Sequence, residues 1–178
     1  MPPISPLERL AALLQTSGAE PDITPERQAP STVYDLEYRV QIVTMAFQIH
    51  AEADRFSIQR RIQARRLKLL QFIAMRPLLI PVIREWSLSR HDAQRSLSGK
   101  EGLKRGFISD TLHEEVLDFL VAAGALRRDE LYVLGGTNSS VIFEPSAQAL
   151  ARSLFQSELN ALSELKSIVI TNEMLEGW

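Results

Sequence analysis

The sequence contains no cysteine and only three histidines, and both shortages exclude kinds of chemistry. Without cysteine, the 178-residue chain has no disulfide, no thiolate zinc site and no cysteine nucleophile. Such a composition is typical of a reducing compartment. No pair among His50, His91 and His113 has the spacing of metal ligands, and no HExxH motif is present. The sequence therefore predicts neither a bound metal nor a cofactor.

Long hydrophobic runs and catalytic motifs are also lacking. No apolar segment approaches the roughly 20 residues that cross a bilayer, and residues 1–15 have neither the basic leader nor the apolar core of a secretory signal. No serine lies in a GxSxG turn. Ser98-Gly99-Lys100 lacks the first glycine and the following Ser or Thr of a phosphate loop. We therefore expect a soluble cytoplasmic protein that is not an enzyme and has no membrane partner.

What the sequence does have is an uneven distribution of charge. The formal net charge is −2, but residues 55–105 carry 13 basic and 3 acidic side chains, a local charge of +10. Residues 1–54 carry −5 and residues 106–178 carry −7. A basic middle between two acidic ends predicts a strongly positive surface zone. Such a zone attracts phosphates or the acidic patch of a protein.

Proline usage divides the chain into an arm and a body. Six of the nine prolines fall within residues 1–32, which we interpret as a Pro-rich arm with one short amphipathic helix. Residues 33–170 are expected to form a single, mainly helical domain, because a chain of this size can bury a core without disulfides. Residues 171–178 are interpreted as a C-terminal tail.

Long helices are predicted at both ends of this domain. Apolar residues recur every three or four positions in residues 33–54, which predicts a wide core face that includes His50. We interpret His50 as a core or interface histidine with its own hydrogen-bond partner. Residues 146–170 return to the same periodicity. The apolar positions of this second helix include Leu150, Leu154 and Leu162.

The centre of the domain is expected to begin with a basic helix over residues 57–75, which Pro77 ends. Arg61, Arg65 and Lys68 would lie within about 60° of arc on this helix. Arg65 falls at the edge of the apolar stripe, where an arginine is expected to pair with a carboxylate or a phosphate. The alternative is an ordinary solvated face.

A long polar loop is predicted after a short apolar helix over residues 78–86. Residues 87–106 are rich in Ser and Gly, and a loop of this length is usually functional or disordered. We expect the cations of the basic helix and this loop to contact DNA phosphate or an acidic partner. Phe56 and Phe107 lie nearby and would either stack on bases or pack in the core. The ten candidate cations are Arg60, Arg61, Arg65, Arg66, Lys68, Arg90, Arg95, Lys100, Lys104 and Arg105.

The clearest helix is predicted over residues 109–124. Thr111 and Glu114 fit a capping box, and Gly124 supplies a C-terminal stop. His113, Glu114 and Glu115 are expected on the solvated face of this helix, and adjacent residues on a helix do not point the same way. The alternative for His113 is a metal contact shared with a distant carboxylate.

The order of elements in the centre resembles a winged helix. Short strands are predicted over residues 131–134 and 141–144, with GGTNSS as the turn between them. The segment VLDFLVAAGALRRDELYVLGG, residues 116–136, has the style of the third helix and wing of that fold. The resemblance implies a mainly α fold with a winged-helix-like centre over roughly residues 57–145, a small β-hairpin, and long flanking helices.

A stand-alone winged-helix transcription regulator is the alternative function that this fold suggests. In such a regulator the helix before the wing enters the major groove. Here that helix carries Glu114, Glu115 and Asp118, and these carboxylates would be repelled by phosphates. The predicted fold is therefore better suited to protein assembly, with DNA contacted non-specifically by the basic zone.

A second resemblance concerns function. The segment RRLKLLQFIAMRPLLIPVIREW, followed by the acidic helix, the weak wing and the leucine-rich helix, resembles the middle component of bacterial three-component defence systems, the Lamassu type among them, over about residues 33–170. In those systems a large SMC/Rad50-like ABC ATPase works with a small middle component and an effector, often a nuclease. The resemblance implies a non-catalytic connector in anti-phage or anti-plasmid defence, which binds the ATPase and positions the effector. It carries over no functional residue, because no tight motif defines the group.

Overall fold

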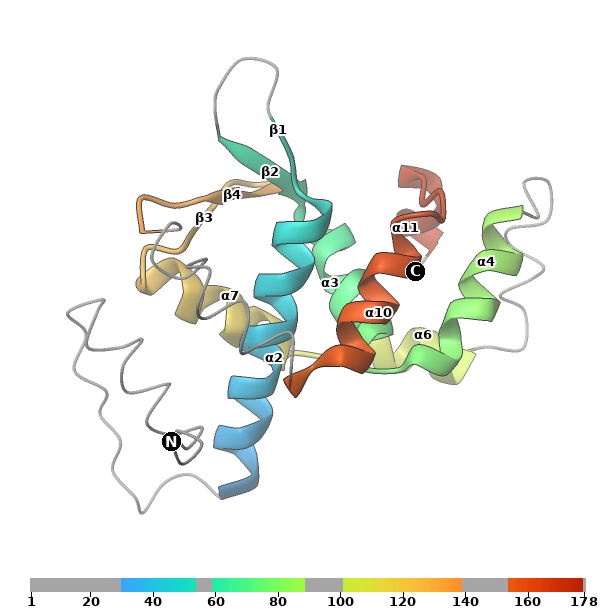
Figure 1. The fold of residues 1–178 in the computed structure, drawn as a ribbon, viewed down its shortest axis with the longest axis horizontal. Coiled ribbons are helices and arrows are strands. Elements are labelled where there is room, and N and C mark those ends of the chain that lie inside the picture. Colours follow the sequence, from blue (N-terminus) through green and yellow to red (C-terminus); the bar gives the residue numbers. More distant parts are fainter. Residues whose placement is uncertain (1–29, 54–58, 89–100, 139–153, 178) are drawn as a thin grey trace.

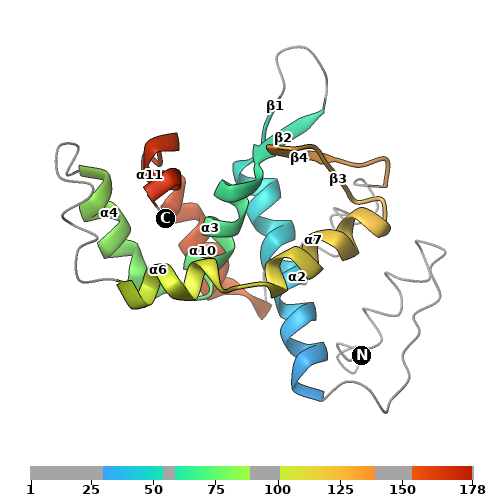
Figure 2. The same cartoon turned by 180° about the vertical axis from the view of Figure 1, so that it is seen from behind.

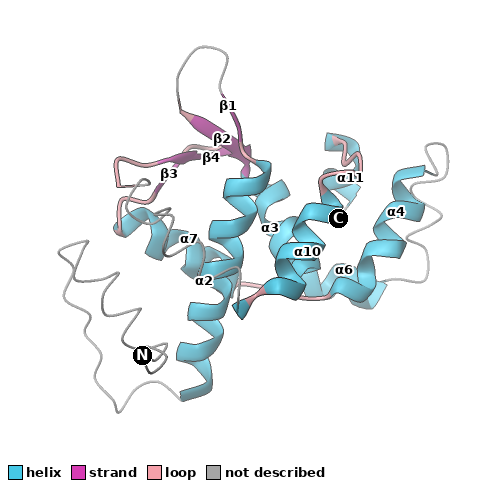
Figure 3. Cartoon of the chain, in the orientation of Figure 1, coloured by secondary structure: helices cyan, strands magenta, loops and turns pink. Residues whose placement is uncertain are grey.

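The computed structural model describes residues 30–53, 59–88, 101–138 and 154–177. These residues form a mainly helical fold with a small antiparallel sheet, as predicted (Figures 1 and 3). Most of the predicted arm, the predicted strand 141–144 and Leu150 lie outside the described residues. The helices are α2 (Pro30–His50), α3 (Ala64–Ala74), η1 (Pro77–Leu79, a 3₁₀ helix), α4 (Ile80–Leu88), α6 (Glu101–Ile108), α7 (Leu112–Ala122), α10 (Gln156–Leu165) and α11 (Asn172–Gly177). The strands are β1 (Glu52–Ala53), β2 (Arg60–Gln63), β3 (Leu126–Arg128) and β4 (Tyr132–Gly135).

Helix α2 forms the centre of the core. It lies between α7 and α10 (Figure 1) and also packs on α3. Val40, Val43 and Phe47 are almost fully buried, because the wide apolar face meets helices on several sides. His50 ends the helix and is buried, and its Nε2 donates a hydrogen bond to the Leu162 carbonyl at 2.8 Å. The prediction of a core histidine with its own partner is confirmed.

The predicted helix over residues 57–75 is wrong in its first part, where residues 60–63 form strand β2. The four strands lie in the order β1-β2-β4-β3, and all neighbours are antiparallel. Ile62 pairs with Val133 and both are buried, while Arg61 points outward. A single isoleucine in a polar run fits a two-residue period as well as a helical one. Residues 60–63 form a strand because they pair with β4, which lies far along the sequence.

The described hairpin lies upstream of the predicted one. Strand β4 coincides closely with the predicted strand 131–134, but its hairpin partner is β3, in the polar segment that precedes it. Gly124 has a φ of +70° and ends α7 as predicted. Its amide donates to the Val121 carbonyl and the Ala125 amide donates to the Leu120 carbonyl, which is a Schellman motif. The winged-helix-like interpretation of this centre stays a prediction.

Thr111 and Glu114 do not form the predicted capping box. Thr111 has helical dihedral angles, and its side chain caps nothing. An N-cap hydroxyl reaches the following amides from an extended backbone, which Thr111 lacks. The Glu114 carboxylate instead pairs with Arg128 of β3 at 2.6 Å.

The C-terminal segment differs from the prediction beyond Leu165, whereas residues 146–153 of the predicted helix lie outside the described residues. Helix α10 covers only part of the predicted range 146–170; Leu162 is buried within the core, and Leu154 is 52% exposed. Residues 172–177, interpreted as a tail, form α11. Met174 and Leu175 of α11 are buried in the core, and α11 packs on α3. Two apolar side chains in this short segment explain why it docks on the body.

Candidate anion-binding surface on helices α3 and α6

The ten predicted cations separate into groups with different surroundings. Arg60 caps the end of α2: its guanidinium donates to the carbonyls of Gln48 at 2.7 Å and Ala51 at 2.6 Å. A cation at a helix C-terminus is stabilised by unpaired carbonyls and by the helix dipole. Arg60 therefore serves the fold. Arg90, Arg95 and Lys100 lie outside the described residues.

Arg61 and Arg66 point in other directions. Arg61 lies on the outer face of β2, and its guanidinium carbon is 4.9 Å from the centroid of the Tyr132 ring. This is a cation–π contact within the sheet. Arg66 is half-buried, and its Nε is buried without a hydrogen-bond partner among the described residues. Neither side chain joins the cluster on α3 and α6.

Arg65 and Lys68 of α3 converge on Phe107 of α6. The Arg65 guanidinium carbon and the Lys68 Nζ lie 5.9 Å and 5.1 Å from the centroid of the Phe107 ring. Lys104 lies one turn before Phe107 on the same side of α6, since residues three apart are neighbours on a helix. Arg105 is exposed on the same helix. The last part of the predicted polar loop, residues 101–106, thus belongs to the helix that completes this cluster.

Arg76 extends the cluster and was missed by the sequence analysis. Its guanidinium carbon is 4.0 Å from the centroid of the Phe72 ring, and its Nη1 donates to the Phe72 carbonyl at 3.2 Å. Phe72 meets Phe107 edge to face, with centroids 5.6 Å apart. Arg65, Lys68, Phe72 and Arg76 are spaced by three, four and four residues, a helical signal that was readable in the sequence. We call Arg65, Lys68, Arg76, Lys104 and Arg105 the basic surface.

Arg65 is held in place by the C-terminal helix. Its Nε donates to the Leu175 carbonyl of α11 at 2.6 Å. The expected carboxylate or phosphate partner is thus replaced, among the described residues, by a main-chain carbonyl. This bond leaves the terminal nitrogens of the guanidinium for other contacts and fixes its direction.

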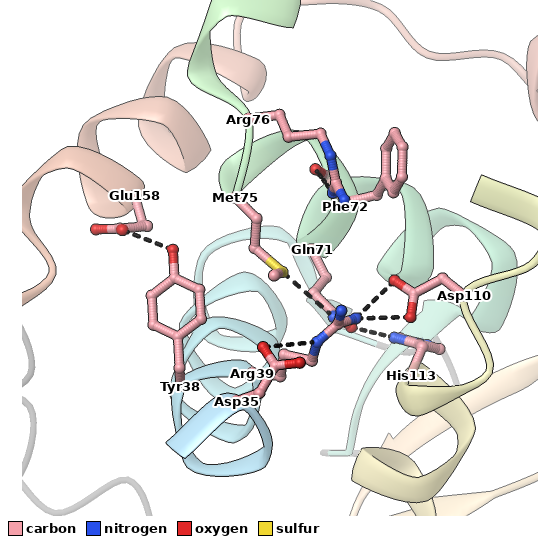
Figure 4. A network of polar contacts seen from close by, with 10 residues as sticks. All are labelled: Asp35, Tyr38, Arg39, Gln71, Phe72, Met75, Arg76, Asp110, His113 and Glu158. Atoms are coloured by element: carbon pink, nitrogen blue, oxygen red, sulfur yellow. Dashed lines mark hydrogen bonds and ion pairs between the residues drawn. The ribbon is translucent and has the colours of Figure 1, made fainter. Parts of the chain in front are cut away.

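A buried ion pair joins α2 to the link between α6 and α7 (Figure 4). Asp110, in the short link between α6 and α7, accepts two hydrogen bonds from Nη1 of Arg39, at 2.7 Å and 2.6 Å. The two side chains are 11% and 8% exposed, and Asp35 approaches the same guanidinium at 3.5 Å. Arg39 therefore ties the end of α6 to α2. It also neutralises the Asp110 carboxylate, whose negative charge would otherwise offset part of the charge of the nearby cations.

His113 contradicts the prediction of a solvated surface histidine. It is 1% exposed, and its Nδ1 contacts Oε1 of Gln71. Burial, and then the nearby charge of Lys68, lower the pKa of His113 to about 3. The neutral ring therefore carries its proton on Nδ1, because the amide oxygen of Gln71 can only accept. Residues 113 and 114 differ by about 100° around the helix, so an exposed neighbour does not make His113 exposed.

A second polar contact in Figure 4 joins α2 to α10. The Tyr38 hydroxyl donates to Oε1 of Glu158 at 2.7 Å. Burial, together with this bond to a carboxylate, raises the pKa of Tyr38 well above its usual value. Tyr38 thus remains a neutral donor that stabilises the packing of the C-terminal helix on the core.

The acidic side chains of α7 form a neighbouring surface of opposite sign. In Figure 2, α7 continues from the end of α6, so the two helices follow one another along the molecule. Glu114 pairs with Arg128, and Asp118 lies 3.9 Å from the same guanidinium. Glu115 is exposed. The structure therefore places the helix that carries these carboxylates directly after the helix that carries Lys104 and Arg105.

The basic surface offers electrostatic binding. In the described part of the chain, no three His, Asp or Glu side chains gather closely enough to hold a metal ion. Within the same residues, no helix is both long and apolar enough to cross a membrane.

Comparison with known proteins found no matching family model, no similar curated protein and no similar solved structure.

Proposed function

We propose that the chain is a non-catalytic accessory subunit, the middle component of a bacterial anti-phage or anti-plasmid defence complex. In this proposal it bridges a large SMC/Rad50-like ATPase and an effector protein, and the basic surface is one of its docking sites. The identity of the partners comes from the sequence resemblance over about residues 33–170. The docking role comes from the geometry of α3 and α6.

The observation that supports docking best is the convergence on Phe107. Lys68 and Lys104 come from separate helices that are brought together by packing, and neither forms an ion pair with any described residue. Cations are mutually repulsive, so gathering them without internal carboxylate partners raises the free energy of the fold. An anionic partner that binds there relieves the repulsion, which favours a binding role for the surface.

A stand-alone DNA-binding regulator is the second candidate, and one observation favours it. The β3–β4 hairpin follows α7 directly, in the position of a wing after the third helix. The carboxylates of Glu115 and Asp118 on α7 oppose this candidate, because they would face phosphates in the major groove.

The deciding experiment is a pull-down of the tagged full chain from its native host, at moderate salt after nuclease treatment, read by mass spectrometry. We expect stoichiometric recovery of a large coiled-coil ATPase and a third protein. Recovery of this chain alone, with a two-fold-symmetric DNA footprint in a separate assay, would overturn the connector and favour the regulator.

Paired variants test whether the basic surface takes part in that complex. Lys68→Gln with Lys104→Gln removes two charges from the half-buried part of this surface, and Arg127→Gln with Lys166→Gln removes two charges from exposed positions elsewhere. We expect the first pair to lower recovery of the partners and the second pair to leave it unchanged. Equal recovery with both pairs would exclude the basic surface as a docking site.

A further inference from the structure

The structure also bears on which kind of anion the basic surface receives, and this inference rests on the proposed function. We propose that the occupant is an acidic helix of a partner protein, whose carboxylates pair with Arg65 and Lys68, and not the phosphate backbone of a nucleic acid. Three properties of the surface carry this choice. They are the burial of its aromatic rings, the acidic surface that follows it, and the spacing of its cations.

The aromatic rings are covered by the cations and are not accessible to bases. Phe107 is 2% exposed and lies under Arg65 and Lys68, and Phe72 is 2% exposed and lies under Arg76. Proteins that bind single strands without sequence preference gain about 1–3 kcal/mol for each base stacked on an accessible aromatic ring. Neither ring offers that contribution here.

A duplex would meet repulsion along the same line. Lys68 lies next to α7, since its charge acts on His113, and α7 continues from α6 (Figure 2). Duplex DNA carries about one charge per 1.7 Å of axis, so a segment laid along α6 would extend onto α7, where Glu115 and Asp118 are exposed. The Asp118 side chain is 76% exposed. A carboxylate on a protein side chain is a compact group that reaches the cations without covering α7.

The spacing of the cations fits a helix. Arg65 and Lys68 are three residues apart on α3, which places their Cβ atoms about 5–6 Å from each other. Carboxylates one turn apart on a partner helix have the same separation, so two ion pairs form at once. The bond from Arg65 to the Leu175 carbonyl fixes the guanidinium before binding, which lowers the entropic cost of those pairs.

An apolar contact completes the match to a protein. Ile108 directly follows Phe107 and is 57% exposed. Protein interfaces typically have an apolar centre with a polar rim. The partner helix is therefore expected to carry a leucine or a similar residue next to its carboxylates.

The test is an NMR titration of the ¹⁵N-labelled full chain at physiological salt with three probes. The first is an alanine-based helical peptide with Glu residues one turn apart and one Leu, the second is the same peptide with Gln in place of Glu, and the third is a short DNA duplex. We expect saturable shifts of α3 and α6 amides with the Glu peptide only. With Lys68→Gln and Lys104→Gln together, its affinity should fall by about threefold, because one of the two proposed ion pairs and one neighbouring cation are removed.

The matched control is Arg127→Gln with Lys166→Gln, which should leave the affinity unchanged. Tighter binding of the duplex than of the Glu peptide, equal shifts with the Glu and Gln peptides, or no saturable shift with any probe would each overturn the inference. The pull-down described above is independent of these probes. Recovery of the ATPase and effector together with a negative titration would refute the acidic helix while keeping the connector.

Discussion

The ion pair between Arg39 and Asp110 provides the most stringent test of how the core is held together. Removing one partner of a buried pair costs about 3–5 kcal/mol, because the other charge stays buried without compensation. For Asp110→Ala we expect about 3 kcal/mol, at the low end of that range, since Asp35 still approaches the Arg39 guanidinium at 3.5 Å. Arg39→Met keeps the apolar stem but leaves the 8% exposed carboxylate of Asp110 without its cation, so we expect a larger loss of unfolding free energy.

A double-mutant cycle separates the pair from the packing around it. The double variant leaves neither charge buried, so it should be less destabilised than the sum of the singles, with a coupling of about 2 kcal/mol. The control cycle uses Arg84→Met and Glu164→Ala, a pair whose side chains are 49% and 46% exposed. Exposed pairs couple by less than about 1 kcal/mol. Urea unfolding followed by circular dichroism gives all the free energies, provided that the slopes agree.

The comparison between the two cycles decides the outcome. Equal coupling energies for the buried and the exposed pair would refute the reasoning. So would a loss below about 1 kcal/mol for Asp110→Ala, which is the range of a solvated contact.

Two further predictions concern glycine and histidine positions. Gly136→Ala should destabilise the fold by at least about 2 kcal/mol, because a Cβ there would lie 2.2 Å from the Gly124 carbonyl oxygen. Gly106→Ala, the matched control, meets only Phe72 at 3.8 Å and should be neutral or stabilising, since Ala favours helix by about 1 kcal/mol; thermal unfolding distinguishes the two, and equal losses would contradict the clash. Burial is the main cause that lowers the pKa of His50 to about 4 and the pKa of His113 to about 3. Below about pH 6.5 the unfolded chain therefore binds more protons than the folded chain. The stability that the two histidines contribute is complete above about pH 6.5 and falls by up to about 1.4 kcal/mol per histidine per pH unit on acidification. When the free energy of unfolding is measured between pH 7 and 4, its dependence on pH should be weaker in His50→Gln. An unchanged dependence on pH would contradict this origin.

The sequence predicted those parts of the fold that depend on local pattern. The core face of α2, the break at Pro77 and the stop at Gly124 are set by nearby residues, and the structure has all three. Strand β2 could not be predicted in the same way. Its pairing partner is β4, and nothing within residues 60–63 distinguishes a strand from the first turn of the basic helix.

The candidate site shows the same division between local and distant information. Charge counting located the basic segment of the chain. It could not show that Arg60 caps the end of α2, or that Arg65 donates a hydrogen bond to Leu175. Both partners are main-chain carbonyls, which every residue carries, so no sequence signal marks them. His113 was misplaced for a related reason, because its partner Gln71 lies on another helix.

The pairing of β2 with β4 has a consequence for how the chain folds. Ile62 and Val133 are adjacent in the sheet, so every residue between them, including α3, α6 and α7, lies within one closed loop. Closing a long loop costs entropy before its contacts contribute anything, and folding rates fall as contacts become less local. The sheet should therefore form late, after α3 and α7 have packed on α2. The entropic cost of closure grows only with the logarithm of loop length, so doubling the length of this loop adds only about 0.6 kcal/mol to that cost. Insertions within the loop should therefore be tolerated.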